Sequence, residues 1–191
     1  SSAASDVYKR QLEYRGIQRD FEDAVRLDNS RAGSPFTRGE GDYAGVLAKL
    51  TPEYIAKLDA RLQPNAWMLR SISAWRSHDV ATARSSANTG LALQTLASGS
   101  RDHVILTLMA GIVYEAESVK KWSELGTSRD VAEYKKLEPA MVKAWKRTDT
   151  ALAAINTATG KFVKDYVHYQ RWRMAENWAS MIFDATTDGI Q

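Results

Sequence analysis

The spacing of the apolar side chains constrains this chain more than any other feature of its sequence. Apolar residues recur every three or four positions in most segments, for example in residues 12–27 and 161–185, with charged residues between them. This spacing places the apolar residues on one face of an α-helix. No stretch shows the sustained alternation of apolar and polar residues that marks a half-buried β-strand. The sequence therefore predicts an all-α fold of about seven helices in antiparallel hairpins, forming an irregular bundle or a stack of hairpins.

The most apolar segment, VILTLMAGIVY at residues 104–114, is predicted to form a buried central helix. Charged residues flank this segment on both sides, Arg101 and Asp102 before it and Glu115 after it. A helix that crosses a bilayer needs about 20 apolar residues, nearly twice the length of this run. We therefore expect the segment to lie in a protein core.

Prolines, glycines and small polar residues predict where the helices begin and end. Residues 30–45 contain four glycines and one proline, which predicts an irregular segment acting as a flexible hinge. Thr51 and Pro52 form a good helix start, and we expect Pro64 to end that helix and Asn65 to cap the next one.

Proline also leaves one boundary open further along the chain. A helix is predicted to begin near Ser128, and Pro139 either kinks this helix or opens a new one. The helix that contains or follows Pro139 is expected to continue to Gly160.

The residues that carry common enzyme chemistry are scarce. The chain has no cysteine, which excludes disulfides, thiolate metal sites and cysteine nucleophiles. Its three histidines include His168, which shares a helix face with Asp165, but no Glu-x-x-His motif of a di-iron protein occurs. No phosphate-binding loop, dinucleotide-binding motif or serine nucleophile elbow is present. We therefore assign no catalytic residue, no cofactor and no metal ligand, and the sequence favours a protein that is not an enzyme without excluding one.

Charge argues against a nucleic-acid partner. The 26 basic and 23 acidic residues give a net charge of only +3. Residues 161–173 mix basic and aromatic side chains, but helical geometry spreads these charges around the axis rather than into a stripe. A protein or peptide partner fits this composition better.

The first eleven residues, SSAASDVYKRQ, resemble a translated adaptor from the preparation of sequencing libraries. This resemblance implies that residues 1–11 are an artefactual leader and that the natural sequence of a metagenomic fragment resumes at Leu12. We then expect residues 12–191 to form a single all-α domain whose own N-terminus is missing. The compartment stays open on this reading, and an exported lipoprotein domain of the periplasm or cell envelope is one alternative.

Residues 65–93 resemble one tetratricopeptide repeat, a helix-turn-helix unit. The resemblance rests on Trp67 and on small residues where two helices would approach, namely Ser71, Ala74, Ala83, Ala87 and Gly90. The segment departs from the family at Arg70, an aliphatic position, and at Ser71 and His78, both glycine positions. A shift of 34 residues does not repeat the pattern. The resemblance implies an interaction module whose groove binds peptides or proteins.

Two Trp-Arg pairs are the candidate partner-binding residues, because tryptophan and arginine dominate the binding energy of many interfaces. They are Trp75 with Arg76 and Trp172 with Arg173. The leading hypothesis is a non-enzymatic interaction or scaffold domain that binds near the hairpin of residues 65–93. The alternative is a helical-bundle carrier or enzyme with a ligand cavity. Its lining would comprise Met109, Tyr114, Trp145 and Trp178.

Overall fold

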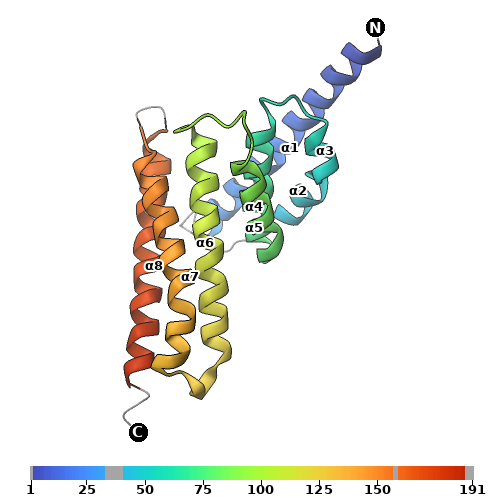
Figure 1. The fold of residues 1–191 in the computed structure, drawn as a ribbon. Coiled ribbons are helices and arrows are strands. Elements are labelled where there is room, and N and C mark those ends of the chain that lie inside the picture. The colour runs from blue at the N-terminus through green and yellow to red at the C-terminus, as the bar shows by residue number, and fades with distance from the viewer. Residues whose placement is uncertain (1, 33–40, 157–158, 188–191) are drawn as a thin grey trace. The chain divides into compact units, whose positions relative to one another are not determined.

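The computed structural model describes residues 2–32, 41–156 and 159–187, and this part of the chain is all-α (Figure 1). It contains eight α-helices, one 3₁₀ turn and no strand. The predicted all-α fold is confirmed, with one helix more than the approximate count. The helices are α1 (Ser2–Ala32), α2 (Tyr43–Lys49), α3 (Pro52–Ala56), α4 (Gln63–Arg76), α5 (Val80–Leu91), α6 (Arg101–Glu124), α7 (Val131–Ala153) and α8 (Lys161–Thr187), with the 3₁₀ turn at Gly126–Ser128. They form two compact units, residues 1–96 and 97–191, while the single domain over 12–191 stays a prediction.

In the N-terminal unit, α1 packs against α2 and α4, and a polar contact fixes the start of α4. The Tyr14 hydroxyl and the Gln18 amide both donate to Oδ1 of Asn65, at 2.7 and 3.0 Å. The expectation that Asn65 caps this helix is therefore wrong. The helix begins at Gln63, three residues earlier than a cap at Asn65 implies, and Pro64 lies in its first turn, where the missing N–H of proline costs nothing.

Helix α2 begins inside the segment that the sequence predicted to be irregular, and its first three residues overlap that segment. Asp42 caps it by accepting a hydrogen bond from the backbone N–H of Gly45 at 2.8 Å. Residues 33–40 of the predicted hinge lie outside the described residues. At the other end of α2, the Arg70 guanidinium donates to the carbonyl of Leu50 at 2.7 Å. Burial lowers the pKa of this guanidinium, and the hydrogen bond to a helix C-terminus offsets part of its desolvation.

The predicted hairpin is present as α4 and α5, which pack closely against each other. Ser71 donates from its hydroxyl to the carbonyl of Ala83 at 2.9 Å, which is consistent with the close approach that small residues allow. The turn residue His78 has a φ of 65°, a left-handed conformation that favours glycine. The hairpin is thus confirmed, while its membership of the tetratricopeptide repeats stays a prediction.

The cap of α5 makes a testable contribution to stability. The Asp79 carboxylate accepts a hydrogen bond from the Thr82 backbone N–H at 3.0 Å, and hydrogen bonds from Thr82 hold the pKa of Asp79 below its ordinary value. A lowered carboxyl pKa stabilises the fold above the unfolded pKa, and this contribution is lost as the pH falls through the folded pKa. We expect Asp79→Ala to cost about 1 kcal/mol at neutral pH. The difference from wild type should shrink in acid, whereas Asp79→Asn, which keeps an acceptor, should cost only a few tenths.

Thermal unfolding of the three proteins at neutral and acidic pH measures this effect. A cost for Asp79→Ala that is the same at both values would contradict a role for the ionised cap.

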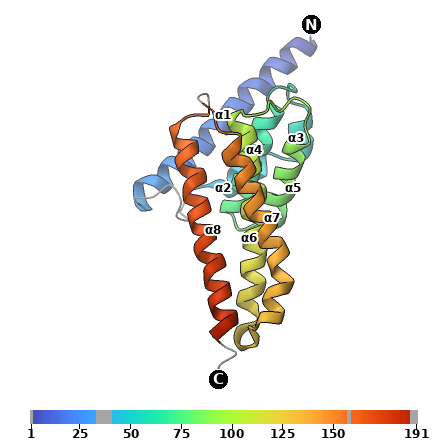
Figure 2. The same cartoon turned by 60° about the vertical axis from the view of Figure 1, so that its left-hand side comes forward.

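In the C-terminal unit, α6, α7 and α8 pack along one another (Figure 2). Every residue from 104 to 113 is buried, which confirms the predicted central helix. Pro139 lies inside the continuous helix α7, so it does not open a new one. None of the described helices combines the length and the apolar character that a membrane span requires. The core of the unit includes Trp122, Tyr134, Met141, Ala144, Met174 and Met181.

Candidate functional site

The four predicted partner-binding residues are divided between the two units. Trp75 and Arg76 lie in the last turn of α4, and both are half-buried. The guanidinium carbon of Arg76 lies 5.3 Å from the centroid of the Tyr43 ring, close enough for a cation–π interaction. Arg76 therefore already contacts α2 within its own unit.

Arg173 on α8 turns inward and neutralises a buried carboxylate. Its guanidinium pairs with Glu115 of α6, whose side chain is completely buried. Asn177 donates to the other carboxylate oxygen, and Nε of Arg173 donates to Oε1 of Gln170 at 3.0 Å. Both oxygens of Glu115 thus have partners, as a buried carboxylate requires. The positive charge of Arg173 is therefore neutralised by Glu115 within the C-terminal unit.

Trp172, the neighbour of Arg173, points the other way and is 57% exposed. Its ring centroid lies 6.1 Å from that of Tyr169. Near the two ends of α8, Phe162 and Phe183 are 58% and 66% exposed. Phe162 stacks nearly parallel on Tyr166, with 6.5 Å between the ring centroids. We call these residues the aromatic face of α8: Phe162, Tyr166, Tyr169, Trp172 and Phe183.

Helical geometry explains why the two members of the pair differ. Successive residues on a helix point about 100° apart, so adjacent side chains do not share a face. The buried residues of α8 recur every three or four positions and turn toward α6 and α7: Val163, Val167, Gln170, Met174, Met181 and Ala185. Trp172 lies on the opposite side, and Arg173 lies at the flank next to α6. The sequence positions along α8 indicate these directions, but they do not indicate the partner of Arg173.

The two flanks of α8 are held by polar contacts that fix its rotation. On the α7 side, Arg171 pairs with Asp149 and donates to the Thr148 hydroxyl at 3.0 Å. Nearer the C-terminus of α8, Nε1 of Trp178 donates to the Tyr134 hydroxyl at 2.8 Å. The contacts of Arg173 hold the α6 side. The aromatic face is consequently presented by a helix that is anchored on both sides.

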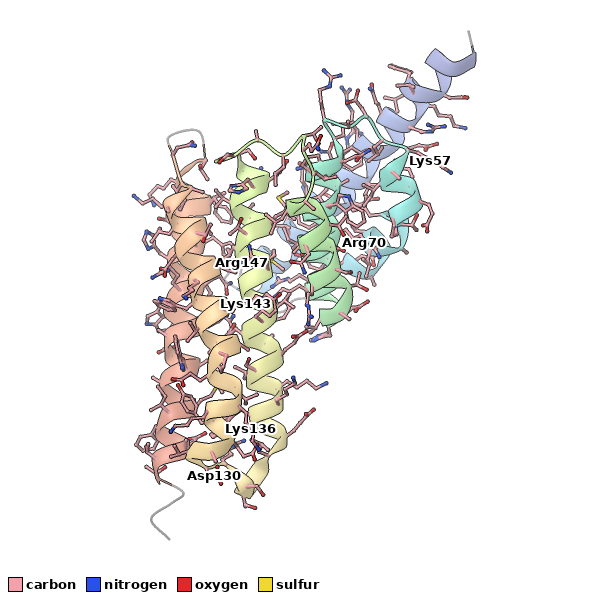
Figure 3. All side chains as sticks on the ribbon, in the orientation of Figure 1. Lys57, Arg70, Asp130, Lys136, Lys143 and Arg147 are labelled. Carbon is pink, nitrogen blue, oxygen red and sulfur yellow. The ribbon has the colours of Figure 1, made fainter. Side chains whose placement is uncertain are left out.

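Several basic residues of α7 are occupied by neighbours in the same unit. Figure 3 labels Lys136, Lys143 and Arg147 along this helix. Lys136 pairs with Glu133, and the ammonium of Lys143 lies 4.3 Å from the centroid of the Tyr114 ring. Both cations therefore contact side chains of their own unit.

The residues proposed to line a ligand cavity are packed into the protein. Tyr114, Trp145 and Trp178 all pack against the core of the C-terminal unit, and the rings of the two tryptophans lie 6.3 Å apart. Met109 is also buried.

A groove of about 380 Å³ lies in the N-terminal unit, beside α1 and the turn that precedes α4. Its wall includes Asp59. Hydrogen bonds from Arg61 lower the pKa of the Asp59 carboxyl to about 2. This internal pairing satisfies the charge of Asp59 without a ligand.

No group of three or more histidines and carboxylates in the described ranges is placed to hold a metal ion. The aromatic face of α8 is therefore the best-defined candidate site in the described residues, and recognition of a partner is the chemistry it offers. We compared the chain with family models, curated proteins and solved structures, and none of the three comparisons found a match.

Proposed function

We propose that this chain is a non-enzymatic helical interaction domain that binds a protein or peptide through the aromatic face of α8. The observation that carries the proposal is the exposure of Trp172, Phe162 and Phe183 on one helix. Large aromatic residues supply much of the binding energy at interfaces, and clustered apolar exposure is typical of interaction sites. The proposal keeps Trp172 from the sequence prediction and moves the binding surface from the hairpin of residues 65–93 to α8.

The anchoring of α8 supports this proposal energetically. Binding is weakened when a surface must be ordered as the complex forms. Here, Arg173 holds α8 to the buried Glu115, and Arg171 holds it to Asp149. The aromatic face is therefore ordered before a partner arrives, and a partner helix or groove gains the full benefit of its contacts.

Selection from a displayed library of random peptides tests the proposal, because such a library samples many peptide sequences at once. We expect the chain to enrich amphipathic peptides with large apolar side chains, which pack against exposed aromatic rings. Trp172→Ala should weaken the selected peptides at least about tenfold, which corresponds to ~1.4 kcal/mol. Fluorescence anisotropy of a labelled peptide measures this change.

Tyr8→Ala is the matched control, because Tyr8 is 64% exposed but lies on α1. It should leave peptide binding unchanged. Failure to enrich any peptide, or peptides that bind Trp172→Ala as tightly as wild type, would count against the proposed function.

A further inference from the structure

We infer that the partner of the aromatic face is a second copy of this chain, packed through an antiparallel contact between the two α8 helices. The inference rests on the proposed function and identifies its partner. It is carried by the spacing, the exposure and the charge pattern of α8.

Four residues on the solvent side of α8 recur with the period of a helix pair. Phe162, Tyr169, Glu176 and Phe183 follow one another at intervals of seven residues. A seven-residue repeat keeps a seam of side chains facing a neighbouring helix when the two helices wind slightly around each other. At 1.5 Å per residue, the seam from Phe162 to Phe183 is about 32 Å long. That length suits a partner that is itself a long helix.

Charge determines the direction in which a second α8 can lie. Glu176 is exposed on the same side of the helix as Trp172, whereas the exposed Asp165 on this side is neutralised by an ion pair with Lys161. In a parallel pair, Glu176 would face Glu176 of the second copy, and like charges directly opposite each other are unfavourable. An uninterrupted apolar stripe on an unrelated partner, with no polar group opposite Glu176, would leave this carboxylate facing a hydrocarbon surface, which costs desolvation without compensation.

An antiparallel pair removes both problems because the face is complementary to itself. About a twofold axis between Trp172 and Arg173, Phe162 meets Phe183 of the second copy at each end. Tyr169 and Glu176 are equally far from this axis, so each Glu176 lies opposite a tyrosine of the second copy instead of a second carboxylate. The two Trp172 rings meet near the axis. This is an isologous contact, which closes as a dimer.

Cysteine cross-linking tests both the identity of the partner and the relative direction of the two α8 helices. The chain contains no cysteine, so every disulfide must come from an introduced residue. Asp165 and Ser180 are exposed and lie opposite each other in the antiparallel register. We would mix separately tagged Asp165→Cys and Ser180→Cys chains and oxidise them mildly. The mixed disulfide should exceed both like-with-like products about tenfold. Lys136→Cys on α7, paired with either variant, is the control for random collision.

Sedimentation of the wild-type chain should show a concentration-dependent dimer that Trp172→Ala dissociates. Preferential Asp165→Cys self-cross-linking, cross-linking no greater than in the Lys136→Cys control, or a monomer at all concentrations would each overturn the inference. Measuring peptide binding in parallel distinguishes failure of the dimer inference from failure of the proposed function. A monomer that still binds selected peptides through Trp172 rejects only the second copy, whereas loss of both signals rejects the aromatic face as an interaction surface.

Discussion

Replacing Arg173 with methionine is expected to lower the free energy of unfolding of the C-terminal unit by about 3 kcal/mol. The substitution leaves Glu115, which is completely buried, with the Asn177 amide as its remaining partner. Removing one member of a buried ion pair costs more than the pair itself contributes, because a buried charge is left without compensation. The expected cost lies at the low end of the usual range, since 29% of the Arg173 side chain is exposed and water can reach that side.

Urea unfolding followed by circular dichroism measures this cost, and Arg171→Met is the matched control. Arg171 is the other arginine of α8 that pairs across helices, but its partner Asp149 is 52% exposed. Although Arg171 itself is only 18% exposed, its removal leaves a carboxylate that water already solvates, so this control should cost about 1 kcal/mol or less. The double variant Glu115→Leu with Arg173→Met should recover most of the loss, because an apolar pair of similar size needs no charge compensation.

The same experiment distinguishes a structural Arg173 from a partner-binding one. A binding residue on the surface would weaken peptide binding when replaced and leave the unfolding free energy nearly unchanged. Equal unfolding costs for Arg173→Met and Arg171→Met would therefore contradict the role that we assign to the contact with Glu115.

Local signals in the sequence predicted much of the fold. The cap at Thr51, the hairpin of α4 and α5, and the buried run of α6 are each marked by residue types within one short stretch of sequence. The start of α4 was misplaced because proline is compatible both with the end of one helix and with the first turn of the next. Asn65 was assigned a local role, but its side chain accepts hydrogen bonds from α1, about 50 positions earlier in the chain.

The candidate site was only half predictable for the same reason. Trp172 was singled out by its residue type, and its exposure follows from the helical positions of its neighbours. The role of Arg173 depends on Glu115, which lies 58 positions away on another helix. Spacing along one helix can indicate which side of that helix a residue faces. It cannot identify the residue of another helix that contacts it.

Substitution of Gly111 tests the closest approach of two helices in the C-terminal unit. A Cβ atom at this position of α6 would lie 3.0 Å from the carbonyl oxygen of Ala144 and 3.1 Å from Cβ of Arg147, both on α7. A leucine there would force the helices apart along a core in which Ala144 is completely buried. We expect Gly111→Leu to cost about 3 kcal/mol, the upper end for overpacking.

Gly16→Leu is the matched control because a Cβ at Gly16, on the exposed side of α1, would meet no atom within 4 Å. Leucine is a better helix former than glycine, so this variant should gain about 0.5 kcal/mol. The two glycines thus predict effects of opposite sign for one and the same substitution. Urea unfolding of both variants measures the difference, and a gain at Gly111 would mean that α6 and α7 do not meet at this glycine. Glycine in α6 is therefore explained by the helix that it faces, since its intrinsic propensity alone would disfavour it there.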